Sequence, residues 1–144
     1  MTQERGSQAP AAPPTGLSRL VQNLEGEERF VEVVAALARG ESATIDGAWG
    51  SACALCTAAL ARRCPSALVV VLPRVGDVES FAADVTAFHE SRPLVFPAWE
   101  SLPEEQESAD PLFAERLRTL ASLDADGSSG LLVCSIAALM QPVP

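Results

Sequence analysis

The sequence predicts an α/β domain in which an open parallel sheet carries helices on both faces. Two observations lead to this prediction. Short apolar runs alternate along the chain with segments whose apolar residues recur at helical spacing. One run, residues 67–72 (ALVVVL), is apolar throughout, which is typical of a strand buried on both faces of a parallel sheet. Strands that alternate with helices form such sheets through right-handed crossovers.

The chain should form one domain after a short leader. Its 144 residues are enough for a single domain with a hydrophobic core. Residues 1–16 are rich in proline, alanine and polar side chains, so we expect a disordered leader there. The domain itself is predicted to occupy residues 17–144.

Two helices should open the domain. A short one is predicted at residues 17–24 and a longer one at 27–38, where apolar side chains recur every three or four positions until Gly40 ends the run. The apolar side chains of the longer helix are Phe30, Val34 and Leu37.

A strand, a turn and a helix should follow. The strand is predicted at residues 43–46 (ATID), the glycine-bearing turn at 47–50 and the helix at 51–62. The run at 67–72 is then the second strand, and Pro73 ends it.

The next helix, at residues 77–89, should lie across the sheet with its acidic positions outward. A short strand at 94–96 ends at Pro97. Residues 98–110 form a long acidic loop, and we interpret its most acidic part, 104–110, as solvated. The apolar side chains of the helix are Val78, Phe81, Ala82, Val85 and Phe88.

The last part of the chain repeats the alternation. Asp110 and Pro111 suit the N-cap and first position of a helix that ends near Leu123. A turn at residues 124–129 leads to a buried strand at 131–134. A final helix, 136–140, stops before Pro142 and Pro144. The apolar side of the longer helix is predicted to hold Leu112, Phe113, Leu117 and Leu120.

Composition excludes several classes of function. The net charge is −9, and phosphate backbones are bound through lysine and arginine, so direct binding of duplex DNA is not expected. No apolar stretch is long enough to span a bilayer, and the first residues lack the apolar core of a secretory signal. We therefore expect a cytoplasmic protein without membrane contact.

The cysteines should be reduced, buried thiols. Cys53 and Cys56 form a C-x-x-C pair, but there is no second pair, and the only histidine, His89, is distant in sequence. We expect no metal site. A nucleophilic Cys53 at a helix N-terminus is an alternative, although no histidine base lies near it in sequence.

Residues 47–54 (GAWGSACA) have the length and placement of a Walker A loop. In that loop a second glycine lets backbone N–H groups close on the phosphates, a lysine reaches the β and γ phosphates, and a hydroxyl binds Mg²⁺. These three positions hold Ala52, Cys53 and Ala54 here. We predict no bound cofactor and no catalytic residue. Two alternatives stay open: an ordinary glycine turn, and a small nucleotide-binding protein or ATPase with an atypical loop.

Several segments, in order, resemble the amino-terminal region of Mfd, the bacterial transcription-repair coupling factor family. The most specific is FPAWESLP, which is similar to the family's F/L-x-x-W-E-T-L-P and places Trp99, Glu100, Leu102 and Pro103 in its motif. The other segments are GAWGSACA, ALVVVLP, DVESFAADVTAFHE, FAERLRTLASL and LLVCSIAALMQPVP. The resemblance covers residues 27–144.

The resemblance implies a fold and a role. In the family this region begins a module similar to the excision-repair protein UvrB, with a P-loop NTPase-like (RecA-like) fold and a degenerate Walker A loop. Compared with UvrB, Gly47, Gly50 and Ser51 match. The family releases stalled RNA polymerase and recruits UvrA in transcription-coupled nucleotide excision repair. Its ATP-driven DNA motor and its contacts with UvrA and RNA polymerase lie downstream, so we expect a non-catalytic module, truncated before them, whose partners are the remaining domains of the factor.

Trp49 and Trp99 are both predicted in loops. Aromatic residues in loops can anchor an interface, but a tryptophan next to a glycine turn more commonly packs over the end of a sheet. We expect packing for both.

Overall fold

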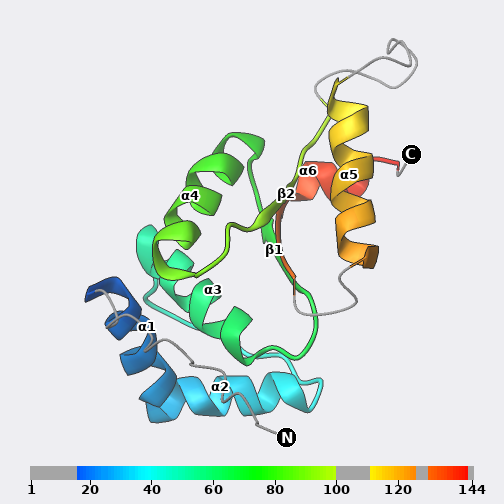
Figure 1. Cartoon of the computed structure of the whole chain (residues 1–144). Coiled ribbons are helices and arrows are strands. Elements are labelled where there is room, and N and C mark those ends of the chain that lie inside the picture. The colour runs from blue at the N-terminus through cyan, green and yellow to red at the C-terminus, as the bar shows by residue number, and fades with distance from the viewer. Residues whose placement is uncertain (1–15, 100–110, 126–129, 143–144) are drawn as a thin grey trace, which may run out of the picture.

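The structure is a computed structural model, which describes residues 16–99, 111–125 and 130–142. It contains a small parallel sheet of three strands, β1 (Leu68–Leu72), β2 (Leu94–Phe96) and β3 (Leu131–Ser135). The strand order is β1-β3-β2, so β3 is central and pairs in parallel with both neighbours. The predicted α/β class with an open parallel sheet is confirmed (Figure 1).

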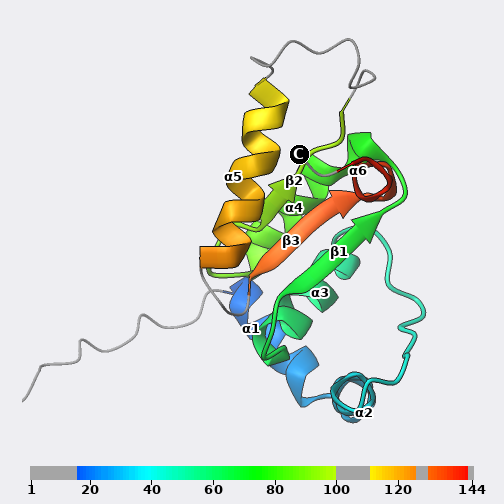
Figure 2. The same cartoon turned by 90° about the vertical axis from the view of Figure 1, so that its right-hand side faces the viewer.

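Helices cover both faces of this sheet. The helices α3 (Ser51–Arg63) and α4 (Val78–Phe88) pack on one face, and α5 (Pro111–Ala125) packs on the other (Figure 2). The core between α3, α4 and the sheet includes Ala54, Val85 and Leu131. The core below α5 is built from Phe96, Ala98, Leu132, Cys134 and Ala138.

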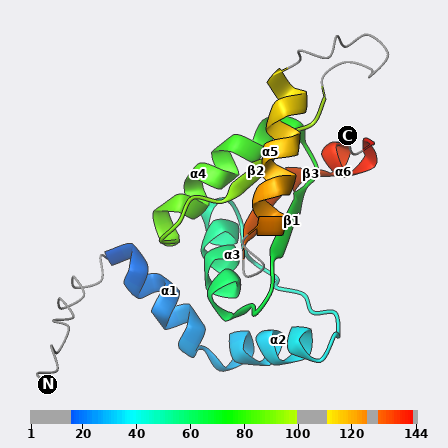
Figure 3. The same cartoon turned by 45° about the vertical axis from the view of Figure 1, so that its right-hand side comes forward.

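Two further helices, α1 (Gly16–Gly26) and α2 (Glu28–Ala38), lie beside α3 on the side away from α5 (Figure 3). Val21 and Phe30 are buried against Ala58 and Ala59 of α3. The chain leaves α2 through Gly40, whose φ of +76° favours glycine because it carries no Cβ. The predicted stop at Gly40 is therefore confirmed.

The remaining elements connect these layers. A single 3₁₀ turn, η1 (Val75–Asp77), precedes α4, and α6 (Ile136–Met140) directly follows β3. The hydroxyl of Ser135 accepts a hydrogen bond from the backbone N–H of Ala138 and so caps α6. None of the helices among the described residues combines the length and apolar character needed to cross a membrane.

The predicted strand at residues 43–46 is wrong. This segment has no regular secondary structure and is exposed, and no strand pairs with it in the described part of the chain. Thr44 and Ile45 favour β structure, but an extended segment becomes a strand only when a neighbour accepts its backbone hydrogen bonds. The described residues therefore hold three of the four predicted strands.

The prediction that β1 is buried on both faces is also wrong. Its side chains alternate between half-buried and exposed, with Val69 48% and Val71 44% exposed. A run of β-branched residues cannot distinguish a central strand from an edge strand, and β1 lies at an edge where α5 does not cover its outer face.

The predicted apolar side of α5 is wrong in part. Phe113 and Leu117 are exposed, whereas Arg116 and Thr119 are buried among the apolar side chains. Both polar residues reach backbone carbonyls beneath the helix, which offsets the cost of burying them.

Several predicted features lie outside the described residues. They are residues 1–15 of the predicted leader, the N-cap residue Asp110, the motif residues Glu100, Leu102 and Pro103, and the acidic loop from residue 100 to 110.

Candidate functional site

The turn before α3 is the predicted phosphate loop, and its backbone is set by two glycines. Gly47 has φ +79° and Gly50 has φ +55°, a region that residues with a Cβ rarely adopt. The backbone N–H of Cys53 donates to the carbonyl oxygen of Gly50 at 3.0 Å, which closes the first turn of α3. The turn therefore leads directly into a helix, although residues 43–46 before it do not form a strand.

The residues at the start of α3 do not suit a nucleotide. Ala52 is exposed, Cys53 is half-buried and Ala54 is fully buried in the core. The thiol of Cys53 donates to the carbonyl oxygen of Ala48 at 3.4 Å, so it binds the turn itself. All ten basic side chains of the sequence are arginines, so no lysine elsewhere in the chain can supply the missing P-loop cation.

An acidic side chain lies against this turn. The hydroxyl of Ser51 donates to Oδ2 of Asp84, on α4, at a distance of 2.9 Å. A carboxylate next to a helix N-terminus repels the phosphate that the helix dipole would attract. The sequence analysis missed Asp84 because the two residues are 33 positions apart and meet only through the packing of α3 on α4.

Cys53 and Cys56 are not joined by further metal-binding side chains in the described part of the chain. Among the described residues no group of three histidine, cysteine or acidic side chains is close enough to hold a metal ion. Burial, followed by the nearby Cys53 thiol, raises the pKa of Cys56 above its ordinary value, which disfavours the thiolate that binds metals and attacks substrates.

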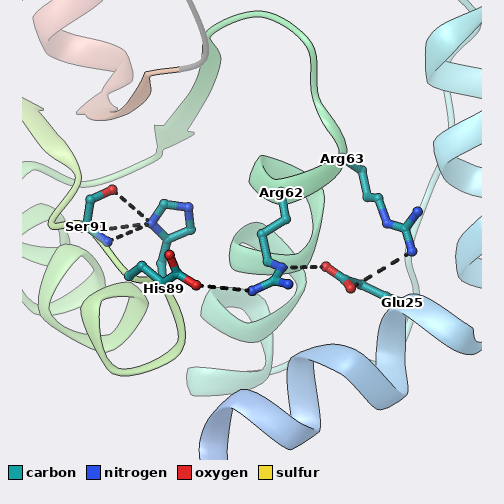
Figure 4. Close-up of polar contacts among 6 residues, drawn as sticks. Glu25, Arg62, Arg63, His89 and Ser91 are labelled. Atoms are coloured by element: carbon teal, nitrogen blue, oxygen red, sulfur yellow. Dashed lines mark hydrogen bonds and ion pairs between the residues drawn. The ribbon is translucent and has the colours of Figure 1, made fainter. Parts of the chain in front are cut away.

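His89 lies away from Cys53, at the end of α4. Its Nδ1 is 3.0 Å from the carbonyl oxygen of Ser91. In the described residues no hydrogen bond joins His89 to Cys53, and Figure 4 shows the histidine beside Ser91 instead. The geometry brings no base to the Cys53 thiol.

The basic pair Arg62 and Arg63 is engaged by an acid on another helix. Nε of Arg62 donates to Glu25 at 2.8 Å, and Arg63 lies 3.9 Å from the other oxygen of Glu25 (Figure 4). Arg62 also approaches Glu90 at 3.8 Å. The Glu25 side chain is only 12% exposed, so these ion pairs fix the end of α1 to the end of α3.

The start of the FPAWESLP segment is held by an arginine that the sequence analysis did not single out. Arg116 of α5 is fully buried, and its guanidinium stacks 4.1 Å from the ring centre of Phe96 and 4.5 Å from that of Trp99. It donates to the carbonyl oxygens of Pro97 at 2.6 Å and of Pro142 at 3.1 Å. Burial lowers the pKa of Arg116 from its ordinary value.

Gln141 completes this cluster. Its Oε1 accepts from the backbone N–H of Trp99 at 2.6 Å, and its Nε2 donates to the Trp99 carbonyl oxygen at 2.9 Å. The pairing joins segments 42 positions apart. A buried arginine inside a helical apolar pattern interrupts the pattern, and this interruption was the available sequence signal for the cluster.

The two tryptophans differ in how far their side chains are buried. Trp99 is 9% exposed and packs on Arg116, as predicted. Trp49 is 84% exposed, so the packing predicted for it is wrong. The strand that would have placed Trp49 over the sheet does not form, and the turn projects into solvent instead.

Comparisons with protein-family models, with curated proteins and with solved structures found no match to this chain.

Proposed function

We propose that this chain is the non-catalytic amino-terminal module of a transcription-repair coupling factor of the Mfd family. Its fold would be a P-loop NTPase-like domain of RecA type in which the Walker A loop is degenerate. Support comes from the parallel α/β architecture, from the glycine turn that opens α3 and from the ordered motifs of the sequence.

The proposal that the module is non-catalytic rests on the side chains around the start of α3. Ala52 and Cys53 replace a glycine and a cation, and Asp84 places a carboxylate 2.9 Å from the hydroxyl of Ser51. Phosphoryl transfer depends on cations that neutralise developing charge, and this turn offers an acid instead. The residues do not fit Mg-ATP.

The role of such a module is interaction within a larger repair factor. The cluster of Arg116, Gln141, Phe96 and Trp99 fixes the first half of the family motif with buried polar contacts. A rigidly held segment is suited to positioning neighbouring domains of the same factor. In this proposal ATP belongs to the family's downstream motor, and UvrA and RNA polymerase are met by downstream regions.

Two measurements test the proposal. Reading the coding sequence after codon 144 should show an open frame that continues into a motor with an intact Walker A lysine. A stop at that point, with no motor encoded, would count against the family assignment. Release of phosphate from Mg-ATP by the purified chain should equal the buffer blank, and turnover above the blank would favour a small ATPase instead.

A further inference from the structure

Cys53 and Cys56 lie on one face of the first two turns of α3. Residues three apart in an α-helix are neighbours on its surface, with their Cβ atoms about 5–6 Å apart. Both side chains are half-buried rather than fully buried as predicted, so neither is sealed in the core. Burial and then the Cys53 thiol raise the pKa of Cys56, and the second effect requires the two sulfur atoms to lie near each other.

This spacing is close to the geometry of a disulfide without matching it fully. A disulfide joins Cα atoms about 4.4–6.8 Å apart, and the helical rise and radius place residues three apart at about 5 Å. Its Cβ atoms, however, must come within about 3.5–4.5 Å, so the first turn of α3 has to tighten. Gly50 caps this turn without a side-chain hydrogen bond, which leaves the turn free to adjust. A disulfide under such strain is easily reduced again.

Oxidation would change the turn in front of α3. The thiol of Cys53 donates to the carbonyl oxygen of Ala48 at 3.4 Å, so its sulfur points back to the turn. A disulfide sulfur has no proton to donate, and the bond to Ala48 is lost when the disulfide forms. The neighbouring Trp49 is 84% exposed, so little packing opposes a rearrangement of the turn.

The other two cysteines are not placed for this reaction. Cys134 is fully buried beneath α5, on the face of the sheet opposite α3, and its thiol donates to the carbonyl oxygen of Val70 at 3.5 Å. Cys64 follows the last residue of α3, eight positions after Cys56, which is about 12 Å along the helix axis. A disulfide cannot span that distance.

We propose that Cys53 and Cys56 are a reversible redox pair, which a low-molecular-weight disulfide converts to a disulfide within α3. Cys53 lies nearer the N-terminus of the helix, where the dipole favours an anion, so its thiolate attacks one sulfur of the small disulfide. One small thiol leaves, and a mixed disulfide remains on Cys53. Cys56 then loses its proton and displaces the second small thiol. Two protein thiols are thereby oxidised, and the small disulfide is reduced to two thiols.

This inference does not depend on the proposed function, since it concerns only the two thiols and the turn beside them. Peptide mass spectrometry of the full chain tests it. Trypsin cleaves after Arg39 and Arg62, so one peptide, residues 40–62, holds both cysteines and no other. After incubation of the folded chain with oxidised glutathione, this peptide should be lighter by about 2 Da, the mass of two hydrogen atoms. Dithiothreitol should restore the original mass.

Single substitutions identify the partners. Cys53→Ser and Cys56→Ser should each abolish the loss of mass, and the remaining thiol of the peptide should carry bound glutathione instead. Cys64→Ser is the matched control and should leave the oxidation of residues 40–62 unchanged.

Tryptophan fluorescence tests the link to the turn. Oxidation should change the emission of the chain, dithiothreitol should reverse the change, and both Cys56→Ser and Trp49→Phe should remove it. The redox pair is ruled out if residues 40–62 keep two free thiols in excess oxidised glutathione, carry only mixed disulfides, or become linked to a second chain. A disulfide that forms without any change in emission would overturn the link to the turn.

Discussion

Ser51, the first residue of α3, donates its hydroxyl hydrogen to Asp84 on α4 across 2.9 Å. This contact occupies the hydroxyl next to the glycine turn and places a carboxylate beside the start of α3. A helix N-terminus alone attracts anions, by about 0.3–1 kcal/mol at exposed positions. Asp84 opposes that attraction, so the start of α3 differs from a phosphate site in its tertiary contacts as well as in its sequence.

Replacing Arg116 should destabilise the domain. Arg116→Leu removes the guanidinium that donates to the carbonyl oxygens of Pro97 and Pro142 and leaves both oxygens without this donor. We expect the free energy of unfolding to fall by about 2–4 kcal/mol, measured by urea denaturation. The free energy of unfolding of Arg116→Lys should lie between those of the parent and of Arg116→Leu. Lysine keeps a positive charge and hydrogen-bond donors, but its ammonium neither stacks on the rings nor donates as a planar fork.

The matched control for this prediction is Arg118→Leu, two positions along α5. Arg118 is exposed and donates only to Ala114 within its own helix among the contacts described. Its loss should change the free energy of unfolding by less than about 0.5 kcal/mol. Equal stability of the Arg116 and Arg118 variants would show that the cluster under α5 contributes nothing specific.

The stability of the domain should fall in alkaline solution because of two thiols. Burial raises the pKa of Cys134 above its ordinary value of 9.0. The pKa of Cys56 is also raised above 9.0, mainly by burial and to a smaller extent by the nearby Cys53 thiol. The folded state thus favours the protonated thiols. Their contribution is complete below pH 9.0 and is lost as the pH rises through the raised values.

Neither tyrosine nor lysine contributes in this window, because the chain contains neither residue. Thermal melts between about pH 7 and 10.5 should show a decline that the double variant Cys56→Ala, Cys134→Ala reduces. An identical decline in parent and variant would assign the effect to something else.

The chain alone should not retard duplex DNA at physiological salt. Its nineteen acidic residues outnumber ten basic ones, and Arg62 and Arg63 are already paired with Glu25. Glu25→Gln should release these arginines, yet two cations remain too few for a stable complex at about 150 mM salt. A shifted band at that salt, with the parent chain, would disprove the prediction.

Much of the fold follows from hydrophobic periodicity. The helix at α4 and the strands β2 and β3 were predicted within about one residue of their observed ends, because their apolar spacing and the flanking proline at 97 are local signals. The prediction of a strand at residues 43–46 was wrong because strand formation also depends on a signal that is not local. These residues favour a strand, but pairing is decided by a distant neighbour that the sequence does not identify.

The candidate site was predictable only in its local part. The substitutions at Ala52, Cys53 and Ala54 can be read from the sequence, whereas the Ser51 to Asp84 contact requires α3 to pack on α4. Arg116 was overlooked since charged residues are seldom fully buried, and its aromatic partners come from a strand end and a loop 17 or more positions away.

Calorimetric titration of the chain with Mg-ATP tests the central claim most directly. With no lysine, no hydroxyl at position 54 and a carboxylate beside Ser51, the titration should show no saturable heat, and Asp84→Asn alone should not create any. Saturable binding by the parent chain with a dissociation constant in the micromolar range would contradict the claim that this loop does not bind nucleotide. Such a constant corresponds to a binding free energy of about −8 kcal/mol.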